Sequence, residues 1–450
     1  MKKIVIIGGD AAGMSAAARA SRGSEPTELV VFEKTNTTSY AACGLPYFVG
    51  GHITEERELI ARTPEAHRAN GIDVRTQHEV TGIDTKARSV MVRSLTDDTS
   101  FTESYDELVI ATGSRAIWPP FPGIDAAGIF SVHTIPDAKR IRCYATTAGV
   151  QHAVVVGGGY IGLEMVEAFL DLGLEVTLIE RLPQPMASFD PEMAELITAE
   201  LQRLGVNVHL SESVERFVAA EDGSVAQVVT NIGTHNADIV VMGLGAKPNT
   251  ELAEAAGIAI GPSGGIATNA QMRTYTPHVW AAGDCAEALH QVSLSPVNIA
   301  LGTHANKQGR TIGMNVSGTP ARFPGVLGTA ITKVREMEIA RTGLSVREAM
   351  VAGFDAVSAQ IRSESRAHYY PGSEPLTVRV VAERGSGRLL GAQIVGGHEA
   401  GKRIDALAVG IAAGLSATEF SLLDLAYAPP FSPVYDPILI AARIAGERAG

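Results

Sequence analysis

A cysteine set among small residues lies about forty residues from the N-terminus. Cys43 follows two alanines and precedes a Gly-Leu-Pro turn in the stretch SYAACGLPY at 39–47. A cysteine can be a small buried side chain or, as a thiolate, a redox nucleophile. Cys143 and Cys285 are distant in sequence and no Cys-x-x-Cys is present, so neither a disulfide framework nor a zinc ribbon is indicated. Both interpretations of Cys43 stay open at this point.

A glycine loop, GGGYIG at 157–162, has the chemistry of a dinucleotide site. Its G-x-G-x-x-G pattern allows a tight turn, close approach of a pyrophosphate to the backbone, and close packing of the following helix, whose N-terminus points N–H groups at the phosphates. Glu180, eighteen residues beyond, is placed to accept hydrogen bonds from an adenosine ribose. This carboxylate favours NADH, whereas Arg181 could attract the 2′-phosphate of NADPH.

A second loop, GGDAAG at 8–13, departs from the pattern because Asp10 replaces the central glycine. Gly8 and Gly13 still permit the turn and the helix packing, and Glu33 stands twenty residues after Gly13, in register for a ribose contact. The Asp10 carboxylate is compatible with a pyrophosphate only if it points away or caps the helix. This loop predicts a second dinucleotide site less strongly than the first.

The elements that must position these loops repeat along the chain. Unbroken apolar runs at 3–7 and 153–156 end in the glycines, and helix formers follow at 11–20 and 160–172. A second apolar run closes each unit, and runs without alternation suit strands buried on both faces of a parallel sheet. From about Phe323 alternating strands and a helix near 404–414 predict an α+β domain. The fold class is therefore α/β, with two Rossmann-like units followed by a smaller domain.

Composition narrows the functional classes. Lys and Arg number 37 against 49 Asp and Glu, without long basic runs, which argues against a nucleic-acid surface. The N-terminal apolar run is too short for a signal peptide and no run reaches a membrane span, so a reducing cytoplasm is the expected location. His67, His78 and His209 are isolated in the sequence and predict solvated or capping roles, with no metal spacing.

Taken in order, the motifs resemble a known family. GGDAAG with Glu33, SYAACGLPY, ATG at 111–113, GGGYIG with Glu180, GLGAKPN and TPHVWAAGDCAE are similar to the flavin-dependent pyridine nucleotide-disulfide oxidoreductases. Within them the chain most resembles the single-cysteine branch that contains coenzyme A disulfide reductase and NADH oxidase. The tail segments at 368–372 and 424–433 resemble the dimerisation domain of that branch. The resemblance spans essentially the whole chain.

The resemblance implies two cofactor sites and a division into domains. The expected FAD residues are Gly8, Asp10, Ala11, Ala12, Gly13, Glu33, Lys34, Ala111, Thr112, Gly113, Gly283, Asp284 and Ala300. The expected NAD(P)H residues are Gly157, Gly159, Tyr160, Ile161, Gly162, Glu180 and Gly245. The expected domains are 1–113 with 246–322 for FAD, 114–245 for NAD(P)H, and 323–450 for dimerisation, in a homodimer.

The resemblance also gives Cys43 a role. Two-cysteine members carry Cys-x-x-x-x-Cys, but here the second position is Phe48, so Cys43 would cycle through a mixed disulfide, a persulfide or a sulfenic acid. Tyr427, with either Tyr369 or Tyr370, matches tyrosines that reach the cysteine across the dimer and could protonate a leaving thiolate. The expected substrate contacts are Arg19 and Arg22 on the first helix, Ser39 and Ala42.

Three functions follow from this resemblance. The first is an NAD(P)H-dependent reductase of coenzyme A disulfide or a CoA persulfide; Ala42 counts against CoA, because the family often has Asn there. The second is an NADH oxidase that reduces oxygen through a Cys43 sulfenate, disfavoured because the first glycine loop lacks a histidine. The third is a flavin-binding interaction protein with vestigial catalysis, disfavoured by the intact Cys43 and the two nucleotide motifs.

Overall fold

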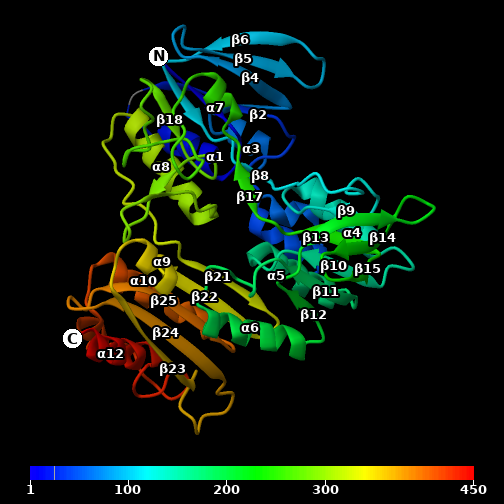
Figure 1. Ribbon diagram of the computed structural model, residues 1–450. Helices are drawn as coiled ribbons and strands as arrows, with labels where there is room; N and C mark the ends of the chain where they lie inside the picture. The colour runs from blue at the N-terminus through cyan, green and yellow to red at the C-terminus, as the bar shows by residue number, and fades with distance from the viewer. Residues whose placement is uncertain (25) are drawn as a thin grey trace. The chain divides into compact units, whose positions relative to one another are not determined.

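The computed structural model describes residues 1–24 and 26–450 (Figure 1). The chain forms two compact units, each made of segments that are separate in the sequence. Unit 1 comprises Met1–Leu45, Ile53–Ile117 and Ala246–Val326, and unit 2 comprises Pro46–His52, Trp118–Gly245 and Leu327–Gly450. The three-domain division expected from the sequence stays a prediction. None of the helices in the described part of the chain is long and apolar enough to cross a membrane.

Unit 1 is built on a five-stranded parallel sheet in the order β18-β7-β1-β2-β3. The apolar residues of the central strands follow one another without alternation and are buried, as in a sheet covered on both faces. The strands are β1 Lys2–Ile7, β2 Thr27–Glu33, β3 Asp73–Thr76, β7 Glu107–Ile110 and β18 Val279–Ala281. Because β18 comes from a distant part of the chain, the edge that would hold a cofactor is assembled from well-separated segments.

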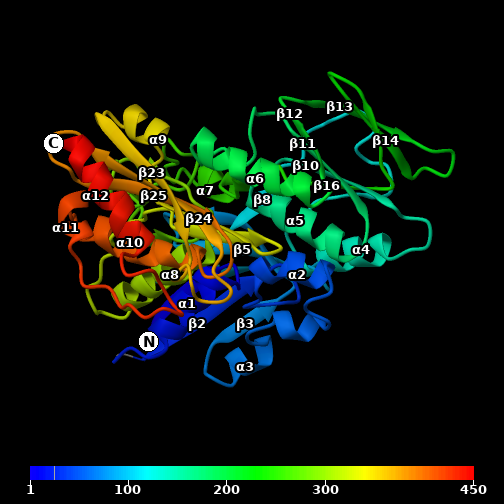
Figure 2. The same ribbon diagram turned by 90° about the horizontal axis from the view of Figure 1, so that it is seen from below.

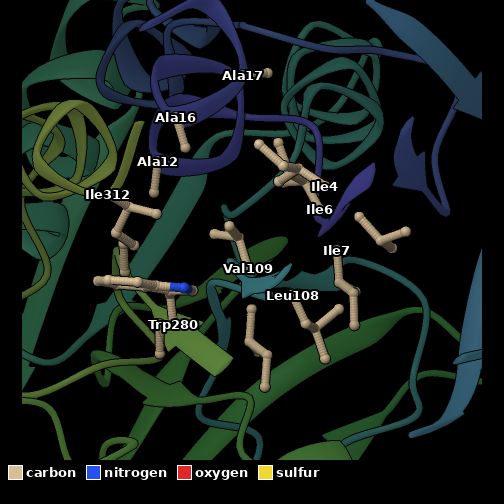
Figure 3. Close-up of a cluster of buried hydrophobic side chains, with 14 of the residues drawn as sticks. Ile4, Ile6, Ile7, Ala12, Ala16, Ala17, Leu108, Val109, Trp280 and Ile312 are labelled. Carbon is tan, nitrogen blue, oxygen red and sulfur yellow. The ribbon is translucent and has the colours of Figure 1, made fainter. Parts of the chain in front are cut away.

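Helices α1 (Ala11–Ala20) and α8 (Gly302–Val316) pack against each other in unit 1. A Cβ placed on Gly309 would lie 2.1 Å from the Ala12 carbonyl oxygen, so only glycine permits this approach. Figure 3 shows Ala12 and Ala16 of α1 beside Ile312 of α8 in the core cluster of this unit. The small residues of α1, read from the sequence as helix formers, are thus also required for packing.

The rest of unit 1 consists of short elements around this sheet. An antiparallel sheet in the order β4-β5-β6 and a pairing of β8 with β17 complete its strands, together with the small β19-β20 ribbon. The elements are η1 Ala42–Gly44, η2 Glu56–Leu59, α3 Pro64–Arg68, β4 His78–Asp84, β5 Ser89–Ser94, β6 Ser100–Ser104, β8 Ser114–Ala116, β17 Ala246–Pro248, α7 Glu251–Ala255, β19 Ala288–Leu289 and β20 Pro296–Val297.

Unit 2 contains a second parallel sheet, in the order β12-β11-β10-β16-β9. Its strands are β9 Ile129–Phe130, β10 His152–Val156, β11 Glu175–Glu180, β12 Asn207–Leu210 and β16 Ile239–Met242. An antiparallel sheet of β13 Val214–Ala219, β14 Val225–Thr230 and β15 Thr234–Asn236 lies between β12 and β16 in the sequence. The helices of this part are α2 Leu45–Val49, α4 Ile135–Ala145, α5 Tyr160–Asp171 and α6 Pro191–Arg203.

The C-terminal part of unit 2 is an antiparallel sheet in the order β21-β22-β25-β24-β23, with α12 packed on β23 and β24 and α10 on β22 and β25 (Figure 2). The strands are β21 Ala330–Val334, β22 Met337–Gly343, β23 Ala356–Glu364, β24 Pro375–Glu383 and β25 Leu389–Gly396. The helices are α9 Val346–Val351, η3 Gly401–Arg403, α10 Ile404–Ala412, α11 Ala417–Ser421 and α12 Pro437–Ala449. The α/β fold with two Rossmann-like units and a C-terminal α+β domain is confirmed.

Candidate functional site

The first glycine loop joins β1 to α1 at the carboxyl edge of the sheet in unit 1. Gly8 has φ of +103°, and a Cβ there would lie 2.1 Å from the Ala111 carbonyl oxygen at the end of β7. A Cβ on Gly13 would lie 1.9 Å from the Gly8 carbonyl oxygen, so both positions require glycine. Gly283, after β18, lies next to α1, since a Cβ there would lie 3.0 Å from the Cβ of Ala12. The predicted residues from three strand ends therefore meet in one place.

Glu33 is held at the end of β2 by the backbone. Its two carboxylate oxygens accept hydrogen bonds from the N–H groups of Gly9, at 2.7 Å, and Thr35, at 2.8 Å. A carboxylate offers about four lone-pair positions, so acceptor capacity remains for a ribose hydroxyl. The neighbouring Lys34 is exposed.

Asp10 is the N-cap residue of α1 but does not cap it with its side chain. Its carboxylate instead accepts a hydrogen bond from the Tyr40 N–H at 3.1 Å, which ties the glycine loop to the segment before Cys43. Burial raises the pKa of Asp10 to about 6; the Tyr40 N–H opposes this shift and the charge of Glu33 adds to it. The residue that breaks the loop pattern thus has a local partner.

Asp10→Asn is expected to change how stability depends on pH. The folded-state pKa of about 6 exceeds the ordinary value of 3.8, so ionisation destabilises the folded state increasingly as pH rises from about 4 to about 6. The asparagine variant lacks this cost and keeps an acceptor for the Tyr40 N–H. Thermal unfolding followed by circular dichroism measures the free energy of unfolding of both proteins. The value for the variant should exceed that of the unaltered chain by an amount that grows to about pH 6 and then levels off at roughly 1 to 3 kcal/mol. A difference independent of pH would contradict the assignment.

The segments after β7 and β18 face each other in unit 1. Ser114 donates a hydrogen bond to the Asp284 carboxylate at 3.0 Å, and the Gly283 N–H donates to Gln308 of α8 at 2.8 Å. Thr112 donates its hydroxyl to the Asn249 carbonyl at 2.7 Å. Gly113 has φ of +65°, and a Cβ there would meet nothing within 4 Å. Asp284 is therefore held by Ser114 in a partly buried position after β18.

Two residues of this region lie in loops. Ala300, one of the expected FAD residues, precedes α8, which begins at Gly302, and is exposed. Cys285 lies in the turn that leads from β18 to β19. Its thiol is fully buried and contacts the Ala282 carbonyl oxygen at 3.3 Å, in agreement with a packing role. Short loops between strands are poorly specified by apolar periodicity.

The second glycine loop, in unit 2, repeats the geometry of the first. Gly157 has φ of +104°, and a Cβ on Gly162 would lie 1.9 Å from the Gly157 carbonyl oxygen. Gly159 differs, since a Cβ there would meet nothing within 4 Å, and its φ of −81° suits any residue. The open side of Gly159, next to the N-terminus of α5, fits the space that a pyrophosphate needs.

Glu180 ends β11 just as Glu33 ends β2. Its oxygens accept hydrogen bonds at 2.7 Å from the N–H groups of Gly158 and Leu182. Of the other predicted residues, Tyr160 and Ile161 open α5 and are partly buried, and burial raises the pKa of Tyr160 to about 12. Gly245 lies two residues beyond Gly243, whose carbonyl oxygen is next to Gly157. The set predicted for the nucleotide thus gathers at one sheet edge.

Cys43 lies in the short η1 turn and its side chain is exposed. Ser39, which has φ of +47°, places its hydroxyl 3.0 Å from Nε2 of His67. His67 is buried on α3, and burial, with help from Arg62, lowers its pKa. The expectation of a solvated or capping His67 is therefore wrong, because α3 turns the ring inward. Ala42, like Cys43, is exposed.

The position that would hold a second redox cysteine is occupied by a buried phenylalanine. Phe48 of α2 is buried, and the Arg142 guanidinium lies 4.8 Å from its ring centroid in unit 2. A ring so placed has a structural role, and the chain contributes no second thiol at that position. Cys143, which follows Arg142 in α4, is exposed.

The tail tyrosines form a pair. Hydrogen bonding to Tyr369 raises the pKa of Tyr427, whereas no such link to Tyr370 is shown. Both members of the pair are well exposed, at 65% for Tyr369 and 45% for Tyr427. The two tail segments are also joined by the backbone, since the Ala367 N–H donates to the Pro429 carbonyl at 3.3 Å. Of the two tyrosines between which the sequence left the choice open, Tyr369 is the one that contacts Tyr427.

The two predicted arginines are not both on the first helix. Arg19 is in the last turn of α1 and is partly buried, whereas Arg22 lies in the turn after the helix has ended at Ala20. That part of the expectation is wrong, because the chain leaves the helix before Gly23. Arg22 is exposed.

One cluster was missed by reading the sequence. His209, expected to be isolated, lies with Glu212 and His235 in unit 2, their ligand atoms all within 4.8 Å of one another. The two histidines are twenty-six residues apart and reach each other only through the fold of the β13–β15 sheet. Sequence spacing gives no signal for such a contact.

Comparison with known proteins gives matches over nearly the whole chain. Residues 2–309 match the pyridine nucleotide-disulphide oxidoreductase family, and residues 329–437 match its dimerisation domain. A protein of Pyrococcus abyssi named NAD(P)H sulfur oxidoreductase (CoA-dependent) is 42% identical over 98% of both chains. An NADH oxidase of Methanocaldococcus jannaschii is 35% identical, also over 98% of both.

A solved structure agrees with these relatives. The NAD-dependent persulfide reductase from A. fulgidus superimposes with a TM-score of 0.95 at 39% identity, over 99% of this chain and 83% of that one. The motifs, the two nucleotide folds and the matched domains point to one family of flavoenzymes. The resemblance read from the sequence is confirmed: the chain belongs to the pyridine nucleotide-disulphide oxidoreductases.

Proposed function

We propose that the chain is an FAD-dependent NAD(P)H:disulfide oxidoreductase that reduces coenzyme A disulfide or a CoA persulfide through Cys43. The observation that carries this proposal is the exposed Cys43 thiol combined with the buried Phe48 at the position of a second cysteine. Since the chain offers no partner thiol there, the second sulfur must come from the substrate. The CoA-dependent name of the Pyrococcus abyssi relative supports the choice of CoA.

The proposed chemistry is a thiol–disulfide exchange. The Cys43 thiolate attacks one sulfur of the substrate disulfide, so a mixed disulfide forms, the substrate S–S bond breaks and one thiolate leaves. With a persulfide the leaving group is hydrosulfide. Two electrons and one proton then convert the mixed disulfide into a thiol and the regenerated Cys43 thiolate. Bound FAD would supply those electrons, taken from NAD(P)H.

The Tyr369–Tyr427 pair is proposed to protonate the leaving thiolate. A phenol with an ordinary pKa near 10 is protonated at neutral pH and can donate a hydrogen bond to sulfur. Both tyrosines fall within the residues matched by the dimerisation domain, which supports a homodimer in which the pair serves the cysteine of the other subunit. Arg19, Arg22, Ser39 and Ala42 are proposed to contact the CoA moiety.

The proposed nicotinamide cofactor is NADH in preference to NADPH. Glu180 is held by two backbone N–H groups, so its charge is fixed where an adenosine 2′-phosphate would be repelled. NADPH remains the alternative because Arg181 is exposed next to it. A thiolate cycle requires a reducing compartment, and we propose the cytoplasm.

A second candidate is an NADH oxidase that reduces oxygen through a Cys43 sulfenate. The Methanocaldococcus jannaschii relative favours it by name. The third candidate, a flavin-binding interaction protein, lacks a comparable observation. The oxidised form of Cys43 differs between the two enzyme candidates. It is a mixed disulfide in the reductase and a sulfenate in the oxidase, and the two forms differ in mass.

Intact mass of the purified protein, before and after thiol reduction, tests the proposal. We expect an adduct of the mass of CoA that maps to Cys43 and disappears on reduction, and Cys143→Ser should not change it. A mass higher by one oxygen at Cys43, with no adduct even after incubation with CoA disulfide, would favour the oxidase. Cys43 that stays unmodified by CoA disulfide and by peroxide would contradict both.

A further inference from the structure

A second cluster of side chains that could do chemistry lies in unit 2, whereas Cys43 belongs to unit 1. His209 is in β12, Glu212 follows two residues after the end of that strand, and His235 is in the short β15. Nδ1 of His209 lies 3.0 Å from one oxygen of Glu212, and Nε2 of His235 lies 2.6 Å from the other. The two rings are 4.4 Å apart between centroids and inclined by 64°.

The carboxylate is at the buried centre of this cluster. The Glu212 side chain is 4% exposed, His235 is 16% exposed and His209 is 37% exposed. Each of its two oxygens faces one of the histidines. The cluster is thus a buried carboxylate at the bottom of a histidine pair that solvent can reach.

Thr230 orients the carboxylate from behind. Its hydroxyl lies 2.5 Å from the same Glu212 oxygen that faces His235. The N–H groups of Ile232 and Gly233 in turn point at the Thr230 hydroxyl oxygen, at 3.3 Å and 3.0 Å. Groups of this kind, behind the residues that bind a metal, fix the orientation of the ligands and raise affinity.

We propose that His209, Glu212 and His235 bind one divalent transition-metal ion of the zinc type. Two imidazole nitrogens and one carboxylate oxygen are a ligand set that such ions prefer, with water in the fourth position. Mg²⁺ and Ca²⁺ prefer sites made of oxygen atoms, so two imidazoles select against them. The site uses none of the residues assigned to the proposed disulfide chemistry and does not depend on it.

Binding requires only a small rearrangement. Zinc ligands at about 2.0 to 2.1 Å from the metal stand about 3.4 Å from one another in a tetrahedron. The present separations of 2.6 Å and 3.0 Å must therefore widen by less than 1 Å. A neutral imidazole whose N–H now faces the carboxylate moves that proton to its other nitrogen, which turns a lone pair toward the metal.

The turn after β12, at residues 211–212, is hydrogen-bonded to the backbone at Glu180 and Leu182. The metal would therefore lie close to the segment that holds Glu180. The Glu212 N–H donates to the Glu180 carbonyl oxygen at 3.0 Å, and Ser211, with φ of +55°, donates its N–H to the Leu182 carbonyl at 2.9 Å. An ion bound by His209 of β12 and His235 of β15 would hold these two strands together. Since it binds the folded chain only, it raises the thermal midpoint of unit 2.

Zinc binding to the tag-free holoenzyme tests the proposal. Cys43→Ser with Cys143→Ser removes the exposed thiols, which would themselves bind zinc. Titration against a chromophoric chelator should give about one zinc per chain, at least tenfold weaker in Glu212→Gln and in His235→Gln. His152→Gln is the matched control, because His152 faces two carboxylates, Glu175 and Asp238, and should leave the affinity unchanged.

Cobalt spectroscopy keeps the test decisive if a variant unfolds. Co²⁺ added to the same double-serine background should give visible absorption typical of four or five nitrogen and oxygen ligands, and this absorption should be lost in His235→Gln that is folded by circular dichroism. The proposal is overturned if no zinc binds at micromolar concentrations, if zinc binds equally well to folded Glu212→Gln and His235→Gln, or if His152→Gln weakens binding as much as they do.

Discussion

Cys43→Ser is expected to lower disulfide-dependent NADH oxidation by at least about 1,000-fold, because a serine hydroxyl forms no disulfide and is a far weaker nucleophile than a thiolate. The serine is nearly isosteric and the side chain is exposed, so folding should be unaffected. NADH should still bleach the flavin absorbance of the variant at nearly the original rate. The measurement is stopped-flow absorbance for the flavin and steady-state NADH consumption with CoA disulfide.

The control for this variant is Cys143→Ser, the same change at the other exposed cysteine. It should retain turnover within about twofold, because Cys143 is an exposed residue of α4 and exposed side chains tolerate such a small change. Turnover of Cys43→Ser within tenfold of the unaltered chain would remove Cys43 from the reaction. Loss of flavin bleaching together with turnover would indicate damage to a cofactor site instead.

Gly159→Ala is expected to raise the KM for NADH by roughly 10- to 100-fold and to leave the fold intact. The added methyl group meets no protein atom within 4 Å and the backbone angles suit alanine, so the thermal midpoint should change by less than about 2 °C. The same methyl group would occupy the space that a pyrophosphate needs against the loop. Steady-state kinetics over a wide range of NADH concentration measure the effect.

Gly233→Ala is the matched control, in the same unit. A Cβ at Gly233 also meets nothing within 4 Å, and its φ is not in the left-handed region. Its KM for NADH should equal that of the unaltered chain. If Gly159→Ala keeps the original KM while both variants stay folded, the nucleotide does not approach this loop, and the proposed NAD(P)H site is wrong.

The two nucleotide folds could be predicted because their signals are local. Unbroken apolar runs, glycines at strand ends and an acid at the end of the next strand each report on a few neighbouring residues. Glu33 and Glu180 were assigned from spacing, and both do lie beside their glycine loops. The antiparallel C-terminal sheet was read from alternation in the same way.

The contacts between distant segments could not be predicted. His67 meets Ser39, Tyr369 meets Tyr427, and His209 meets His235 only because loops and hairpins bring them together. No periodicity in the sequence encodes which residues of two loops will touch. Arg22 was misplaced for a related reason, since the end of a helix is set by local capping that a broad pattern does not resolve.

The packing of α8 and β18 in unit 1 has a consequence for how the chain is synthesised. The first sheet acquires its edge strand only at Val279–Ala281, and α1 acquires its packing partner only at Gly302–Val316. A ribosome must therefore make the entire 118–245 segment before the first nucleotide fold can close. Until then the glycines and small residues of α1 lack the surface they are shaped to meet, so the flavin fold is completed late although it begins at the N-terminus.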